Sequence, residues 1–154
     1  MRDALVIADS SCLILLAKIE ELEILRSVYK RIFITKEIAG EFGGELPEWI
    51  EVKEIENKTL QSLFEEILDW GEASALSLAF EMQDCTVILD DLKARKTAAK
   101  LNIKVTGTIG VIVKAKTENK IPSATAVFEK ILETDFRISD RILNEAIKLA
   151  GEQP

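Results

Sequence analysis

Four acidic residues stand where a parallel α/β sheet would bring them to one edge: Asp9, Glu41, Glu72 and Asp91. Carboxylates that face one another raise each other's pKa unless a cation lies between them. Ligand sets made only of oxygen atoms favour hard divalent ions such as Mg²⁺ or Mn²⁺. The chain has no histidine, which argues against a zinc site or a histidine-based triad. The four acids therefore predict a catalytic site that uses Mg²⁺ or Mn²⁺.

Two of these acids follow predicted strands directly. Asp9 comes after the apolar run 4–8, and the pair Asp90-Asp91 comes after the apolar run 87–89. Apolar runs of this length with β-branched residues are typical of buried strands. Ligands of open α/β folds bind at the carboxyl ends of such strands. We expect Asp9, Glu72 and Asp91 to bind the metal, with Asp90 as the alternative ligand beside Asp91.

The other two acids belong to predicted helices. Glu41 falls in a short helix after a strand at 31–34, and Glu72 opens an apolar helix that reaches about residue 82. The alternating segment 50–55 predicts a half-exposed edge strand. Further elements are expected as a strand at 103–105 and as helices at 12–18, 20–29, 58–69, 91–101, 109–116 and, closing the chain, at about 123–150.

This alternation of strands and helices predicts one α/β domain over residues 1–154. Right-handed crossovers would give a three-layer α/β/α fold around a mainly parallel, twisted sheet of about five strands. No apolar stretch approaches the roughly 20 residues that a membrane span needs. Cys12 and Cys85 both lie in apolar contexts, so we expect free thiols and a reducing cytoplasm rather than a disulfide.

Several polar residues near these acids could contact a substrate. The net charge of −7 argues against a protein that coats nucleic acid, but it leaves room for a local basic approach to an acidic cleft. Lys93, Lys96 and Lys100 recur at helical spacing beyond Asp91, where they either steer phosphates or form a solvated face. The hydroxyl of Ser10 either caps the next helix or orients a water or phosphate.

Together these motifs resemble the PIN-domain family, which includes the toxin ribonucleases of VapC-type toxin–antitoxin pairs. The resemblance rests on residues 6–11, 34–42, 71–76 and 87–95, and the tail at 136–152 is similar to an uncharacterised prokaryotic PIN-like subfamily. It implies a metal-dependent ribonuclease with an RNA substrate. It further implies that the protein forms a homodimer and that an antitoxin protein binds it.

Simpler explanations exist for each feature. Asp9, Glu72 and the Asp90-Asp91 pair could only stabilise helix N-termini, and Glu41 could be a surface acid. An inactive PIN-like module would act through dimerisation or partner binding instead. A small-molecule phosphohydrolase would carry a second acid two residues after its nucleophilic Asp, where this chain has Ser11.

Apolar residues in the helices at 12–29 and 123–150 predict a surface for a dimer or an antitoxin, because the sheet covers only part of them. The alternative is that they complete the core of the monomer. The residues concerned are Leu13, Leu16, Leu22, Leu25, Val127, Ile131, Ile142 and Ile147.

Overall fold

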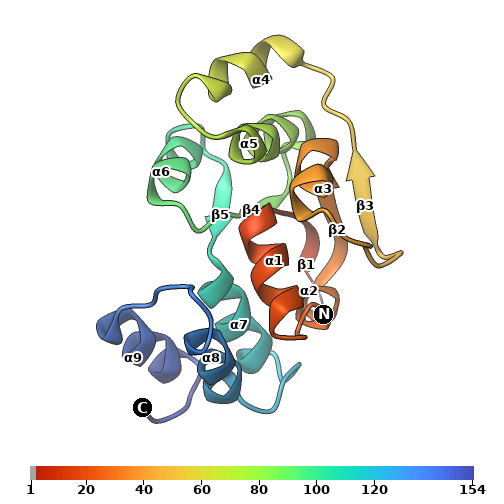
Figure 1. Cartoon of the computed structure of the whole chain (residues 1–154). Coiled ribbons are helices and arrows are strands. Elements are labelled where there is room, and N and C mark those ends of the chain that lie inside the picture. Colours follow the sequence, from red (N-terminus) through yellow and green to blue (C-terminus); the bar gives the residue numbers. More distant parts are fainter. Residues whose placement is uncertain (1–2) are drawn as a thin grey trace.

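A five-stranded sheet forms the centre of the molecule in the computed structural model, which describes residues 3–154. The strands follow the order β3-β2-β1-β4-β5, and every pairing between them is parallel (Figure 1). The predicted number of strands and their parallel direction are confirmed. The strands are β1 (Asp3–Ala8), β2 (Tyr29–Thr35), β3 (Ile50–Lys53), β4 (Thr86–Ile88) and β5 (Lys104–Thr106).

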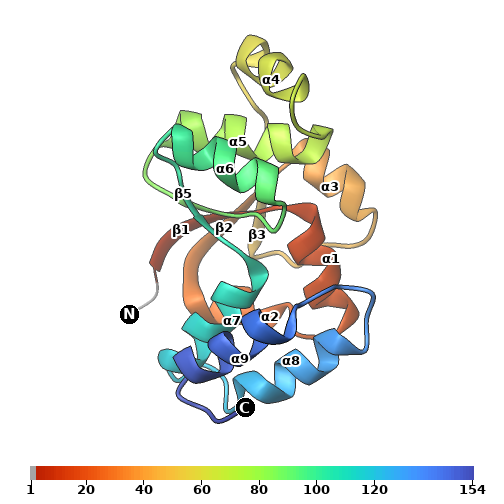
Figure 2. The same ribbon diagram turned by 90° about the vertical axis from the view of Figure 1, so that its left-hand side faces the viewer.

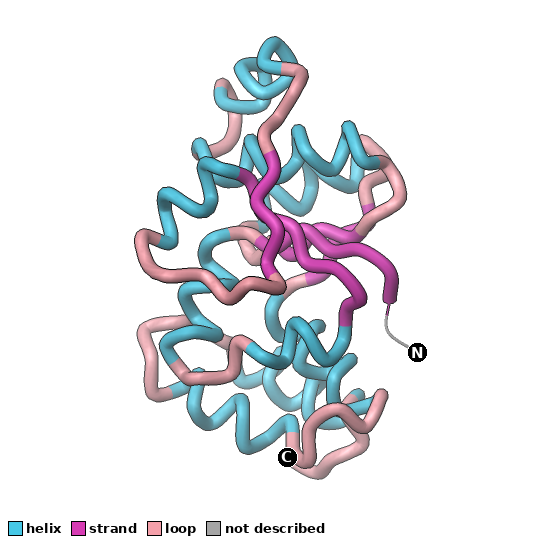
Figure 3. Tube along the Cα trace, turned by 90° about the vertical axis from the view of Figure 1, so that its right-hand side faces the viewer, coloured by secondary structure: helices cyan, strands magenta, loops and turns pink. Residues whose placement is uncertain are grey.

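Helices cover both faces of this sheet, which confirms the three-layer α/β/α architecture. The helices α5 and α6 lie on one side, and α2, α7, α8 and α9 lie on the other (Figures 2 and 3). The nine described helices are α1 (Ser10–Lys18), α2 (Glu23–Val28), α3 (Lys36–Phe42), α4 (Lys58–Glu65), α5 (Trp70–Met82), α6 (Leu92–Lys100), α7 (Thr108–Thr117), α8 (Ala124–Leu132) and α9 (Asp140–Leu149).

Burial explains the two kinds of strand pattern. In β1, the residues Val6, Ile7 and Ala8 are fully buried, because this central strand is covered by helices on both faces. The edge strand β3 is largely exposed, as predicted, but its burial does not alternate, because Ile50 is buried and Val52 is about half exposed. The helix α5 is buried over most of its circumference, since it packs on the sheet and also contacts α3 and α4.

Side-chain caps set several helix boundaries. Thr35 caps α3, and Gly43 ends it with a left-handed φ of 71°. The predicted start of the first helix was wrong. Its N-cap is Asp9, whose carboxylate accepts the backbone N–H of Ser10 at 2.8 Å, so that Ser10 and Ser11 lie inside α1.

The predicted apolar contact surface was mostly wrong. Of its eight residues only Ile142 is exposed, and Leu22 is partly buried. The other six belong to the core. Leu13 and Leu16 are buried in α1, and the remaining four are buried where α2, α8 and α9 pack against α7. Cys12 and Cys85 are buried free thiols. Among residues 3–154, no helix is both long and apolar enough to span a bilayer.

Candidate active site

The sheet topology brings Asp9 and Asp91 to the same edge. Asp9 follows β1 and Asp91 follows the neighbouring strand β4 by three residues. The backbone N–H of Asp9 donates to the carbonyl of Ile88 at 3.3 Å, which ties the two strand ends together. The chain leaves β1 towards β2 and leaves β4 in the opposite direction, towards β5. The edge between these strands is therefore the topological switch point at which open α/β sheets bind ligands.

Asp9 is the buried centre of the acidic site. Its side chain is only 5% exposed. Burial is the largest cause that raises its pKa to about 7. The negative charges of Glu72, Asp69 and Glu41 act in the same direction, and the hydrogen bond from Ser10 opposes them. Carboxylates from α3 and from the N-terminus of α5 thus lie close enough to Asp9 to disfavour its charged form.

Glu41 reaches the site from α3, where it is exposed. The hydroxyl of Ser10 donates to Glu41 Oε1 at 2.8 Å, so Ser10 orients an acid of the site in this structure. The Glu41 carboxylate also lies directly against Gly71 in α5. A Cβ atom at position 71 would come within 2.8 Å of Glu41 Cδ, closer than real Cβ contacts allow. The absence of a side chain at Gly71 lets α3 and α5 bring Glu41 and Glu72 together.

Glu72 lies in the first turn of α5 and forms a capping box with Asp69. The Glu72 N–H donates to Asp69 Oδ1 at 2.8 Å, and the Asp69 N–H donates to Glu72 Oε1 at 3.4 Å. Burial raises the pKa of Glu72 to about 7, with further contributions from the charges of Asp69, Asp91 and Glu41. Asp69 is a fifth acid that the sequence reasoning missed. Its signal was the Asp-x-x-Glu spacing that ends at Glu72.

Asp90 and Asp91 have different surroundings. The carboxylate of Asp91 caps α6 by accepting the Ala94 N–H at 2.9 Å, and its charge contributes to the raised pKa of Glu72. The two oxygens of Asp90 accept the N–H and the hydroxyl of Thr108 at 2.8 and 2.6 Å. Asp90 therefore anchors the start of α7, whereas Asp91 belongs to the electrostatic cluster.

The oxygen ligands of these acids fit a hard divalent cation. We define the acidic cluster as Asp9, Glu41, Asp69, Glu72 and Asp91. Within residues 3–154, no lysine or arginine forms an ion pair with any of the five. In the same part of the chain, no three potential ligands lie close enough, as placed, to hold a metal ion. A cation would relieve the repulsion that raises the pKa values. To hold one ion, three of these carboxylates would have to lie closer together than they do here.

A comparison with known protein families identifies the fold. The sequence matches the family model DUF3368, a PIN domain, over residues 5–152. The chain belongs to the PIN-domain family. PIN domains are generally nucleases, which bind nucleic acid and usually use divalent metal ions. No curated protein matches the chain.

The predicted substrate-binding lysines of this PIN domain lie on α6. Lys93, Lys96 and Lys100 are exposed, and none forms an ion pair with a carboxylate of the described residues. The structure leaves them outside the acidic cluster, on the helix that Asp91 caps. Their positive charges are available to solvent or to an anion.

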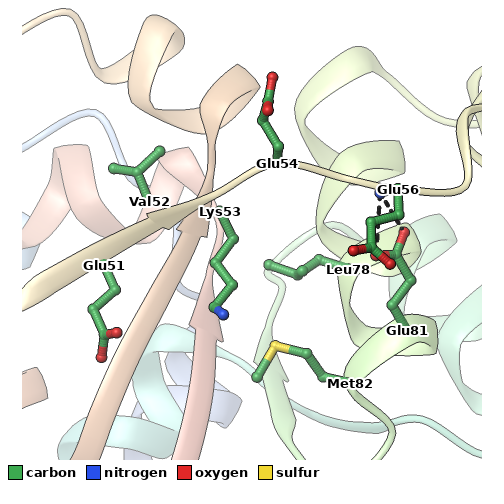
Figure 4. A pocket seen from close by; sticks show the side chains of 8 residues that line it. All are labelled: Glu51, Val52, Lys53, Glu54, Glu56, Leu78, Glu81 and Met82. Carbon is green, nitrogen blue, oxygen red and sulfur yellow. Dashed lines mark hydrogen bonds between the residues drawn. The ribbon is translucent and has the colours of Figure 1, made fainter.

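A hollow of about 500 Å³ lies between β3 and α5, and two of its acids, Glu51 and Glu81, already have partners within the fold (Figure 4). The carboxylate of Glu81 accepts the N–H groups of Glu56 and Asn57 at 3.0–3.2 Å. Glu51 forms a bidentate pair with Arg31 at 2.8 and 2.9 Å. Because these carboxylates are compensated, this hollow is a weaker candidate for a catalytic site than the cluster around Asp9.

Proposed function

We propose that this PIN-domain protein is a metal-dependent ribonuclease that hydrolyses RNA phosphodiester bonds. The observation that carries the proposal is the uncompensated acidic cluster at the switch point between β1 and β4. Acids from separate elements converge there, and the pKa values of Asp9 and Glu72 rise to about 7. Such perturbed carboxylates are typical of functional sites rather than of surfaces that stabilise a fold.

The proposed ligands of Mg²⁺ or Mn²⁺ are Asp9, Glu72 and Asp91, with Glu41 completing the set. The cation would supply charge neutralisation at the scissile phosphate and activation of the attacking water. Asp9 is buried and fixed between β1 and α1, so it would anchor the ligand set. Ser10 would keep Glu41 directed towards the site through its 2.8 Å hydrogen bond. Asp90 is the less favoured ligand, because Thr108 occupies both of its oxygens.

Cleavage of single-stranded RNA by the purified protein tests the proposal. Activity should require Mg²⁺ or Mn²⁺, stop in chelator, and fall about a hundredfold or more in Asp9→Asn, as when electrostatic stabilisation of a transition state is lost. The matched control is Asp135→Asn, because Asp135 is a fully solvated acid whose side chain is 94% exposed.

Metal binding should be measured separately from activity. A hundredfold excess of metal over its dissociation constant should stabilise the parent by about 2.7 kcal/mol, and Asp9→Asn should reduce this gain. If neither Mg²⁺ nor Mn²⁺ changes the melting temperature and no RNA is cleaved, the results would instead support an inactive module that acts through partner binding.

The further partners predicted from the sequence remain proposals: a homodimer and, if the protein is a toxin, an antitoxin. Exposed apolar residues on the outer helices support such contacts, namely Leu132 in α8 and Ile142 and Leu149 in α9. Sedimentation at micromolar concentration should give a dimer, and Leu149→Glu should shift it towards the monomer. A parent that sediments as a 17.2 kDa monomer would contradict the homodimer. The free buried thiols agree with the proposed cytoplasmic location.

A further inference from the structure

A second hollow, of about 270 Å³, lies between the turn that joins β5 to α7 and the segment that leads into α9. Small-molecule sites occupy roughly 300–1,000 Å³, so this volume suits a group no larger than one nucleotide unit. We define it as the arginine hollow by its two cationic residues, Arg95 and Arg137. Its other lining residues are Asp90, Thr106, Gly107, Ile109, Gly110, Phe136, Ile138, Ser139 and Ile142.

The charge of the arginine hollow is opposite to that of the protein. The chain carries a net charge of −7, yet the charged residues of this lining are two arginines and Asp90. Asp90 also faces the hollow, but the hydrogen bonds from Thr108 satisfy its carboxylate. Neither guanidinium forms an ion pair or side-chain hydrogen bond with another described residue. Two unpaired guanidinium groups are well suited to bind a phosphate.

The fold places Arg95 at this position by close packing. Its Nη1 lies against Gly107, where an added Cβ would approach to 2.7 Å. Gly107 is also the N-cap of α7, and the carboxylate of Asp90 caps this helix end by accepting the Thr108 N–H. The charge of Asp90 thus offsets the positive end of the α7 dipole, and the two arginines are the cationic groups of the hollow. On the opposite wall, Phe136, Ile138 and Ile142 offer apolar surface of the kind on which a nucleobase can rest.

The arginine hollow and the acidic cluster are connected by consecutive residues of the chain. Asp90 lines the hollow, and the next residue, Asp91, contributes to the raised pKa of Glu72. The Cα atoms of consecutive residues are only about 3.8 Å apart. A single strand could therefore lie with one phosphate near the acids and a neighbouring phosphate near the arginines.

We propose that the arginine hollow binds one nucleotide of a single-stranded RNA next to the cleavage site, with Arg95 and Arg137 on its phosphate and Phe136 beside its base. This inference rests on the proposed ribonuclease function for the identity of the strand. An unpaired strand is required, because stacking within a duplex hides the faces of its bases.

Binding of a fluorescent single-stranded RNA, measured by anisotropy in chelator, tests the hollow without any cleavage. Arg137→Gln and Arg95→Gln should each weaken binding about tenfold, the loss expected for one charge-assisted phosphate contact. The matched control is Arg141→Gln, since Arg141 is exposed on α9, pairs with Glu145 and does not line the hollow. Arg137 is exposed, so Arg137→Gln should keep the parent melting temperature and remains informative if Arg95→Gln unfolds.

Phe136→Leu should weaken binding of the ordinary strand and leave binding of an abasic strand unchanged. Unchanged affinity in Arg137→Gln, or an equal loss in Arg141→Gln, would overturn the proposal. Loss of metal-dependent cleavage is measured independently. If the parent protein cleaves RNA and the Arg137→Gln variant binds RNA normally, only the proposed role of the hollow is refuted. If binding depends on Arg137 but the parent cleaves no RNA, only the proposed nuclease activity is refuted.

Discussion

Two carboxylate sites in this PIN domain show opposite electrostatics. Around Asp9 and Glu72, burial and like charges raise the pKa values to about 7. Glu152 near the end of the chain accepts the Thr125 hydroxyl at 2.6 Å and the N–H groups of Ala124 and Thr125 at 2.7 and 3.0 Å. The Thr125 hydroxyl is the largest cause that lowers the pKa of Glu152 to about 2, and Lys116 adds its positive charge.

The opposite pKa shifts distinguish an acid that stabilises the fold, Glu152, from acids whose proximity destabilises it, Asp9 and Glu72. Donors at the N-terminus of α8 surround Glu152 and favour its charged form. Asp9 has only the Ser10 N–H and faces other acids. The same chemical group therefore stabilises the fold at one place and opposes it at the other, unless a cation binds.

The largest expected effect is a gain in stability on removing a charge. Asp9→Asn should stabilise the metal-free protein at pH 8 by on the order of 2–4 kcal/mol. The neutral side chain removes the cost of burying a charged carboxylate whose pKa is raised to about 7. Asparagine keeps an acceptor for the α1 cap. The raised pKa of Asp9 also predicts that the unfavourable contribution of this residue is absent below about pH 4 and grows as the pH rises to about 7.

Urea unfolding between pH 4 and pH 8 measures both effects, and the decline with pH should be shallower in Asp9→Asn than in the parent. The comparison between the two sites fails if Asp9→Asn destabilises the metal-free protein at pH 8 while Asp135→Asn does not.

A smaller effect of opposite sign is expected at the other site. Glu152→Gln should lower the free energy of unfolding at pH 7 by about 2 kcal/mol, since it weakens charge-assisted hydrogen bonds. The lowered pKa means that this contribution is complete above about pH 4.5 and is lost as the pH falls towards about 2. Denaturation at pH 7 and pH 2 should show the difference only at the higher pH. Glu129→Gln, an exposed change in α8, serves as the control.

The smallest effect should come from the lysines of α6. Reversing the charge of Lys93, Lys96 and Lys100 should weaken RNA binding. The log–log slope of affinity against salt should become shallower by about 0.7 for each phosphate that the protein no longer neutralises. The metal affinity of the acidic cluster should stay the same. The matched control reverses three exposed lysines of other segments: Lys58, Lys120 and Lys148. A slope equal to that of the control would assign the α6 lysines to a solvated face.

The features predicted correctly from the sequence are those that short residue patterns determine, such as the positions of buried strands. Apolar runs before Asp9 and Asp91 located β1 and β4, and their pairing then brought the two acids to one edge. The capping role of Asp69 was also encoded locally, in its spacing from Glu72, and was overlooked. The contact of Ser10 could not be found this way, because its partner Glu41 lies 31 residues further along the sequence. Burial of Val127 and Ile131 was missed for the same reason, since it depends on how α8 packs against α7.

Gly71 has a consequence for interpreting other sequences of this family. The carboxylate of Glu41 occupies the space that a side chain at position 71 would fill. In a relative with a larger residue before its counterpart of Glu72, the flexible side chain of Glu41 would have to turn to another rotamer, away from the hydroxyl of Ser10. Such a relative would retain every acid of the site, but one of them would be oriented differently. A motif that describes this orientation therefore includes a position whose contribution is a missing atom.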